Sequence, residues 1–244
     1  MESMKKVVII GGQTAAKIGE LFASAGVKVA ILDSLTDSAD ELARADIVIE
    51  AVDGDGGTRK EVILRCDEVI PPGAILATTA SSAITETASL TGRPGKFIGL
   101  NFTFNPFQEG CLVQITKGLE TAAETIKTCT DLLKGAGVTA IEVADLPGLV
   151  LDRVMASAIN EAAIMHMTKV ATVEDIDSVA KSCLNWPVGP FQFADVIGID
   201  NVLATLEILS REVSPRFLPC RIFKQMVAAG RLGKKAGRGF YTYS

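Results

Sequence analysis

Apolar and polar positions along the first part of the chain follow the period of a strand, then of a helix, then of a strand. Residues 7–10 form an unbroken apolar run, which is typical of a strand buried on both faces of a parallel sheet. Residues 14–25 carry apolar side chains at helical spacing, and residues 27–32 return to an apolar run. The pattern predicts a βαβ unit whose glycine turn is Gly11-Gly12.

The alternation of strands and helices continues to residue 145. The further apolar runs predict strands within residues 47–52, 74–78, 97–101, 112–115 and 139–143. Helical spacing between these runs falls at residues 58–70, 81–90 and 119–134. After residue 145 only helical spacing remains, at residues 149–169, 173–184 (with Thr172 as N-cap), 200–213 and 218–229. We therefore predict an α/β fold, in which residues 1–145 form a Rossmann-type, doubly wound, mostly parallel sheet and residues 146–244 an all-helical C-terminal domain.

Composition and charge narrow the possible partners. The 24 basic and 29 acidic residues give a net charge of −5 without the clustered cations that nucleic acid requires. No apolar run approaches the ~18 residues of a membrane span, and because the first strand begins close to Met1 we expect no signal peptide. The five cysteines show no C-x-x-C or paired spacing, so reduced thiols are expected. We expect a cytoplasmic protein that binds a small molecule, with no nucleic-acid, membrane or metal partner.

The first βαβ unit carries a modified dinucleotide-binding signature. Asp33 follows the second strand. Its distance along the chain from Gly12 is near the ~20-residue offset at which an acid reaches the ribose of a bound dinucleotide. The glycine pattern allows two readings: with Gly12 as the middle glycine only that position is retained, and with Gly11 as the first glycine Gln13 stands at the middle position. The amide groups at the start of the helix remain available to an anion in either reading. The residues are compatible with two interpretations: a functional dinucleotide site, and a Rossmann-type unit that binds its cofactor weakly or not at all.

Several blocks resemble the 3-hydroxyacyl-CoA dehydrogenases, including the 3-hydroxybutyryl-CoA enzymes, in order and spacing. These blocks are residues 45–52, Ser81-Ser82, 97–99, Asn105-Pro106, 145–148, 186–191 and 230–241. The resemblance covers nearly the whole chain. It implies an NAD-binding Rossmann domain, a helical domain that forms a homodimer and contacts the substrate, and NAD-dependent interconversion of a 3-hydroxyacyl thioester, or a related hydroxy acid, and its 3-keto form in fatty acid metabolism.

The resemblance also places four catalytic positions, of which one keeps the family's residue. The serine corresponds to Ser81. The family's histidine corresponds to Asn101, or to Phe102 if the one-residue excess before Asn105-Pro106 lies earlier, and its glutamate corresponds to Gln114. The family's asparagine corresponds to Asp152. Because amide side chains do not titrate near neutral pH, the Asn101–Gln114 pair cannot act as a general base.

The cofactor positions show further differences. The family's glutamate and lysine after the third strand correspond to Gly54 and Arg59, and its asparagine before the serine pair corresponds to Thr79. The long helical excursion that helps to grip coenzyme A in the family is reduced here to residues 34–44. The candidate cofactor-binding residues are Gly11, Gly12, Gln13, Thr14, Asp33, Ala51, Val52, Arg59 and Thr79.

Each candidate also has a structural interpretation. Ser81 could cap the following helix rather than contact substrate, and Asp152 could form a salt bridge rather than act as a base. His166, the one histidine, lies among apolar residues and is interpreted as structural. Two functional hypotheses therefore compete: a divergent NAD-dependent 3-hydroxyacyl-CoA dehydrogenase that acts on an acyl-CoA-like substrate, and a catalytically silent pseudoenzyme that serves a related subunit as a partner or ligand-binding chain.

Overall fold

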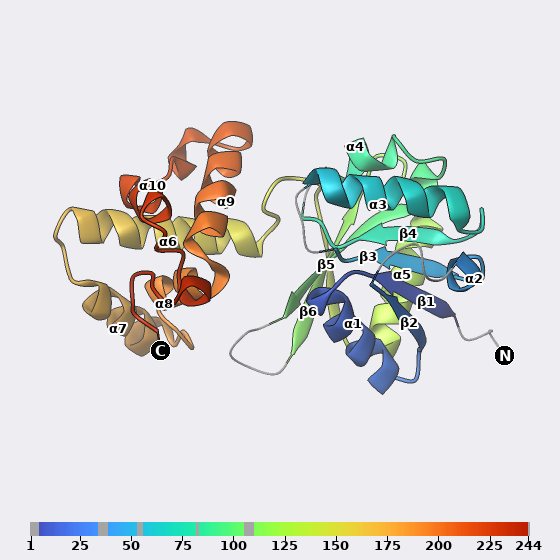
Figure 1. Ribbon diagram of the computed structural model, residues 1–244, viewed down its shortest axis with the longest axis horizontal. Coiled ribbons are helices and arrows are strands. Elements are labelled where there is room, and N and C mark those ends of the chain that lie inside the picture. The colour runs from blue at the N-terminus through green and yellow to red at the C-terminus, as the bar shows by residue number, and fades with distance from the viewer. Residues whose placement is uncertain (1–4, 34–38, 53–55, 82, 105–109, 244) are drawn as a thin grey trace. The chain divides into compact units, whose positions relative to one another are not determined.

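The computed structural model describes residues 5–33, 39–52, 56–81, 83–104 and 110–243 (Figure 1). The chain divides into two compact units, residues 1–146 and residues 147–244. No helix among these described ranges is both long enough and apolar enough to cross a membrane.

The first unit is built on one seven-stranded sheet with the strand order β2-β1-β3-β4-β5-β6-β7. The strands are β1 (Lys6–Ile10), β2 (Lys28–Leu32), β3 (Ile47–Glu50), β4 (Ile75–Thr78), β5 (Phe97–Phe104), β6 (Cys111–Lys117) and β7 (Thr139–Val143). Neighbouring strands pair in parallel except β5 and β6, which are antiparallel. The predicted mostly parallel Rossmann-type sheet is confirmed.

Helices cover both faces of this sheet because successive strand residues point to opposite sides. Val7, Ile9 and Ile47 pack with buried residues of α1 and α5, whereas Val8 and Val48 pack with buried residues of α3 and α4. The helices are α1 (Gln13–Ser24), α2 (Ala39–Leu42), α3 (Gly56–Val69), α4 (Ile84–Ala88) and α5 (Ala123–Gly135). This two-sided burial explains why the central strands appear in the sequence as continuous apolar runs.

The sheet has its topological switch point between β1 and β3. From β1 the chain moves to β2 on one side, and then returns to place β3 on the other. In open α/β sheets ligands bind outside the carboxyl ends of the strands at such a point. The turns after β1, β3 and β4 therefore meet at the edge where a nucleotide is expected.

The second unit is helical, as predicted. Its helices are α6 (Leu151–Met167), α7 (Val173–Leu184), α8 (Pro190–Ile197), α9 (Ile199–Glu212) and α10 (Arg221–Ala228). Thr172 is the N-cap of α7, as expected, since its hydroxyl accepts from the Asp175 backbone N–H at 3.2 Å. The sequence patterns did not predict α8, which begins at Pro190 and follows Gly189 as N-cap.

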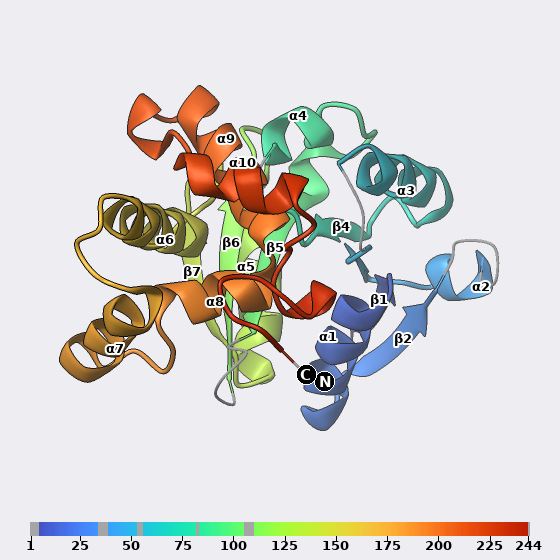
Figure 2. The same ribbon diagram turned by 60° about the vertical axis from the view of Figure 1, so that its left-hand side comes forward.

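Two buried carboxylates organise the second unit. Asp177 on α7 accepts from the backbone N–H groups of Phe191 and Gln192 at 2.9 and 3.0 Å, which satisfies the start of α8. Asp195 on α8 accepts from the backbone N–H groups of Phe240 and Tyr241, each at 2.9 Å. Figures 1 and 2 accordingly show the C-terminal segment beside α8. The last residues therefore pack as part of the helical unit.

Candidate functional site

The turn after β1 leads into the start of α1 at the carboxyl edge of the sheet. The cap position of α1 is Gly12, with no side-chain cap and no acid in the first turn of α1 within the described chain. Gly11 has a φ of +146°, and a Cβ there would lie 2.2 Å from the backbone oxygen of Ala51. Only glycine permits this approach of β1 to β3. The geometry favours the reading in which Gly11 is the first glycine, and Gln13 is exposed at the start of α1.

Asp33 lies at the same edge as this helix start. It directly follows Leu32, which is paired with Ile10 at the end of β1, and the Gly11 N–H donates to the Leu32 oxygen at 3.0 Å. Helix amides suit a pyrophosphate, and an acid one strand away suits the ribose hydroxyls. An acid here also disfavours the 2′-phosphate of NADP because of charge repulsion. This set of groups fits NAD, although the first βαβ turn lacks two of the three signature glycines.

A buried carboxylate connects the turns after β3 and β4. Glu50 is fully buried, and its Oε1 accepts from the Val52 backbone N–H at 2.7 Å and from Arg59 Nε at 3.0 Å. Its Oε2 accepts from the Thr78 hydroxyl at 2.6 Å. Arg59 also donates through Nη2 to the Thr79 hydroxyl. Of the candidate cofactor residues, Val52, Arg59 and Thr79 are thus brought into one network.

Sequence analysis did not identify Glu50 or Thr78 as part of this site. A signal was present, since Glu50 is a charged residue inside the apolar run of a strand expected to be buried on both faces. Buried charges in proteins are paired, so such a residue indicates that a cation lies nearby. The structure supplies that cation as Arg59.

Asn101 and Gln114 lie directly opposite one another on the antiparallel strands β5 and β6. Gln114 Nε2 donates to Asn101 Oδ1 at 3.4 Å, and the Thr103 hydroxyl donates to the same oxygen at 3.3 Å. Asn101 Nδ2 donates to the backbone oxygen of Thr79 at 3.1 Å. Because a carbonyl can only accept, this contact fixes the orientation of the Asn101 amide. Asn101 is therefore held beside the turn after β4, which contains Ser81.

The structure does not support the interpretation of Ser81 as a helix cap. The N-cap position of α4 is Ala83, and no side chain of the described residues caps the helix from that position. Instead, the Asp145 carboxylate accepts from the backbone N–H groups of Ile84 and Thr85 at 3.1 and 2.8 Å. Asp145 thus performs the capping, and Ser81 retains the substrate-contact interpretation.

Asp152 lies in the first turn of α6, in the second unit. Burial raises the pKa of its carboxyl above the ordinary value of 3.8, which strengthens it as a base. No ion pair of Asp152 occurs among the described residues, so the expected salt bridge with a basic neighbour is not found. The neighbouring Arg153 instead donates to the backbone oxygen of Pro147 at 2.9 Å.

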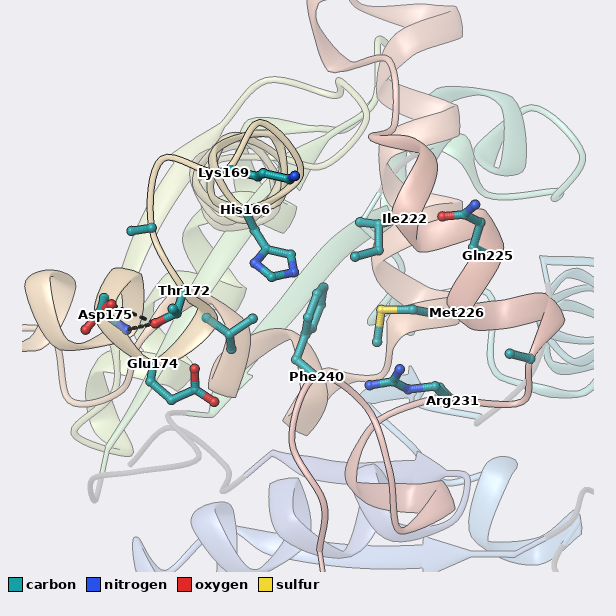
Figure 3. Close-up of a pocket in the computed structure, with 13 residues that line it drawn as sticks. His166, Lys169, Thr172, Glu174, Asp175, Ile222, Gln225, Met226, Arg231 and Phe240 are labelled. Carbon is teal, nitrogen blue, oxygen red and sulfur yellow. Dashed lines mark hydrogen bonds between the residues drawn. The ribbon is translucent and has the colours of Figure 1, made fainter.

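A separate pocket of about 970 Å³ lies within the helical unit. In Figure 3, His166 from α6 and Phe240 from the C-terminal segment point toward one another, with Ile222 and Met226 of α10 beside them. His166 also packs edge-on against Phe191, with ring centroids 6.0 Å apart. The residues that line this pocket include none of the candidate catalytic or cofactor residues. The candidate site is therefore the carboxyl edge of the sheet.

Several sequence positions named above lie outside the described residues. They are Gly54, Ser82, Asn105 and Pro106. Among the residues that the structure does describe, no group of three His, Cys, Asp or Glu side chains could hold a metal ion.

The fold and the residues at the carboxyl edge of the sheet define a class of protein. The members of this class are oxidoreductases of two units, a Rossmann NAD-binding sheet and a helical C-terminal unit. Two family models match the chain. The 3-hydroxyacyl-CoA dehydrogenase NAD binding domain matches residues 34–146, and the C-terminal domain of the same family matches residues 148–243. The chain belongs to the 3-hydroxyacyl-CoA dehydrogenase family, as its sequence blocks indicated.

Individual relatives agree with this assignment. The chain is 41% identical to a probable 3-hydroxybutyryl-CoA dehydrogenase of Bacillus subtilis over 86% of this chain and 74% of that protein. The crystal structure of (S)-3-hydroxybutyryl-CoA dehydrogenase PaaH1 from Ralstonia eutropha is similar, with a TM-score of 0.89 and 32% identity over 99% of this chain and all of that one. M. tuberculosis FadB2 gives a TM-score of 0.91 and 28% identity over the full length of both chains.

Proposed function

We propose that this protein is an NAD-dependent dehydrogenase that interconverts a 3-hydroxyacyl-CoA thioester and its 3-ketoacyl form. One observation carries the proposal: the α1 amides and Asp33 lie at the same carboxyl edge of the sheet as the Asn101–Gln114 pair. A cofactor site and a polar pair are thus provided together in a chain of this family. NAD, when bound, supplies the hydride acceptor, and NADH the donor.

The chain's own residues orient the substrate oxygen. Asn101 Nδ2 uses one proton for the Thr79 oxygen, and its second proton has no acceptor among the described residues, so it can donate to the carbonyl or hydroxyl oxygen of a substrate. Gln114 and Thr103 hold the Asn101 oxygen, which keeps the amide in this orientation. Ser81, two residues beyond Thr79, is the second candidate donor for the substrate oxygen. Such preorganised donors stabilise the charge that develops on oxygen during hydride transfer.

The proton must come from another group because neither amide titrates near neutral pH. We assign that role to Asp152 or to water, with the raised pKa of Asp152 favouring the carboxyl. Loss of a general-base pair lowers turnover by roughly 10²–10⁴-fold. The proposed enzyme is therefore slow compared with a dehydrogenase that carries such a pair.

The proposal includes the roles of the two units. The first unit is the NAD-binding domain, and the helical unit contacts the thioester and forms a homodimer in a cytoplasmic enzyme of fatty acid metabolism. Val154, Ile164 and Met167 on α6 support a protein contact, since these apolar side chains are exposed on the unit. Static light scattering tests the dimer, and a monomeric mass would remove it from the proposal.

The function is tested by following NADH consumption with 3-ketobutyryl-CoA in a homogeneous preparation that contains no other family member. We expect slow, saturable turnover to an (S)-3-hydroxybutyryl thioester, lowered but still measurable in Asn101→Leu, and little turnover of free 3-ketobutyrate. Consumption of NADH that does not depend on the thioester, or none at all, would overturn the proposal and support the catalytically silent partner hypothesis.

A further inference from the structure

Arg59 joins the buried carboxylate of Glu50 to the turn after β4. It lies in the first turn of α3, and its side chain is 21% exposed. Its Nε donates to Glu50 at 3.0 Å while its Nη2 donates to the Thr79 hydroxyl. Because the guanidinium is planar and its donors form a rigid fork, these two bonds fix the position of Thr79 relative to β3.

Glu50 anchors the guanidinium through contacts on both neighbouring turns. Its oxygens are held by the Val52 backbone N–H and by the Thr78 hydroxyl, and the Thr78 hydroxyl in turn accepts from the Ala80 backbone N–H at 3.1 Å. A buried carboxylate with three donors is restrained in position. Arg59 is therefore attached to a rigid point inside the sheet, and Thr79 is attached to Arg59.

Thr79 passes this restraint on to Asn101. Its backbone oxygen accepts from Asn101 Nδ2 at 3.1 Å, the contact that fixes which end of the amide faces Gln114. A shift of the Thr79 peptide would thus move the second Nδ2 proton of Asn101. No comparable contact connects Arg59 to Asn101 directly among the described residues.

We propose that Arg59 is a positioning residue for Asn101, acting through Thr79. This role differs from the cofactor contact that the family resemblance implies for position 59. The effect on turnover rests on the proposed function, whereas the effect on the Asn101 amide does not. Misplacing a catalytic group by about 1 Å can lower turnover about 10²-fold, so the link is large enough to measure.

The first test observes the Asn101 side-chain amide by NMR in protein free of cofactor. Loss of its two N–H resonances in Asn101→Asp identifies them. We expect both resonances to move in Arg59→Lys, which keeps a positive charge beside Glu50 but not the planar fork, and in Thr79→Val, which removes the hydroxyl. Arg65→Lys, on the same helix and in an exposed pair with Glu61, is the matched control and leaves them in place. Unmoved resonances in Arg59→Lys would overturn the proposal.

The second test is a kinetic cycle. Arg59→Lys is expected to lower kcat about 10- to 100-fold with the Kd of NADH unchanged, and to cause no further loss in an Asn101→Leu background. An increased Kd of NADH, together with a loss that persists in Asn101→Leu, would instead make Arg59 a cofactor contact. If wild type shows no turnover but Arg59→Lys still moves the Asn101 amide resonances, the positioning role is supported and the proposed function alone is contradicted.

Discussion

Replacing Asn101 by His and Gln114 by Glu would give this site a titrating pair on a backbone that already places the two residues together. Their Cα atoms are direct partners across β5 and β6, and their amides are 3.4 Å apart. Gln114 is buried, so a hydrogen bond from residue 101 would stabilise a carboxylate at this position. The double variant supplies that partner as the imidazole N–H.

The structure sets the size of each effect. In the single variant Gln114→Glu, the new carboxylate faces Asn101 Oδ1, and the Asn101 amide cannot rotate without losing its bond to the Thr79 oxygen. We expect this variant to lose about 1–3 kcal/mol of unfolding free energy, because a buried carboxylate oxygen then faces the Asn101 carbonyl oxygen and two acceptors cannot hydrogen-bond. The double variant should recover that loss and gain about 10²–10⁴-fold in kcat, or about 2.7–5.5 kcal/mol of transition-state stabilisation.

The assay is reduction of 3-ketobutyryl-CoA by NADH as a function of pH, with urea unfolding of each variant alongside. Reduction requires the protonated imidazole as acid, so the rate of the double variant should fall as pH rises through about 6.5, a step that the Asn101–Gln114 pair itself cannot give. Both single variants serve as controls. A double variant that is folded and binds NADH but reduces the thioester no faster than wild type would refute the assignment of this pair to the reacting oxygen.

Four further substitutions test other residues of the two units. Ser81→Ala should lower turnover without lowering the melting temperature, whereas Asp145→Ala should destabilise the first unit by about 0.5–2 kcal/mol because it removes the cap of α4. Asp152→Asn should be more stable than wild type at neutral pH. Burial raises the folded pKa of Asp152, so wild type loses unfolding free energy as pH rises from the ordinary pKa through the folded value, whereas the asparagine variant does not. In acid, below the ordinary pKa, this difference in stability between the two proteins should disappear. Asp195→Ala should destabilise the helical unit by about 3 kcal/mol or more in urea unfolding, since it leaves two backbone N–H groups of the C-terminal segment without their acceptor; an unchanged midpoint would contradict this role.

Much of the fold could be predicted because burial on both faces leaves a direct record in the sequence. The apolar runs of β1, β3 and β4 and the helical spacing of α1 and α7 identify elements whose packing is determined by their own side chains. The short helix α8 was missed because its start is satisfied by Asp177 from another helix. Local sequence carries no sign of that contact.

The site could be predicted only in part for the same reason. The pairing of Asn101 with Gln114 followed from the family blocks, but the link from Glu50 through Arg59 and Thr79 joins residues 9 and 20 positions apart along the chain. Asp145 reaches α4 across about 60 positions. Side-chain contacts of this range depend on strand order and register, which hydrophobic periodicity does not specify.

The central claim is that the carboxyl edge of the sheet binds NAD despite its modified glycine turn, and a fluorescence titration with NADH tests it without any assumption about the substrate. We predict saturable micromolar binding, weaker binding of NADPH, and loss of binding in Asp33→Ala with an unchanged melting temperature. Absence of NADH binding at millimolar concentration, in a protein shown to be folded, would contradict the claim and leave the Rossmann unit as a scaffold.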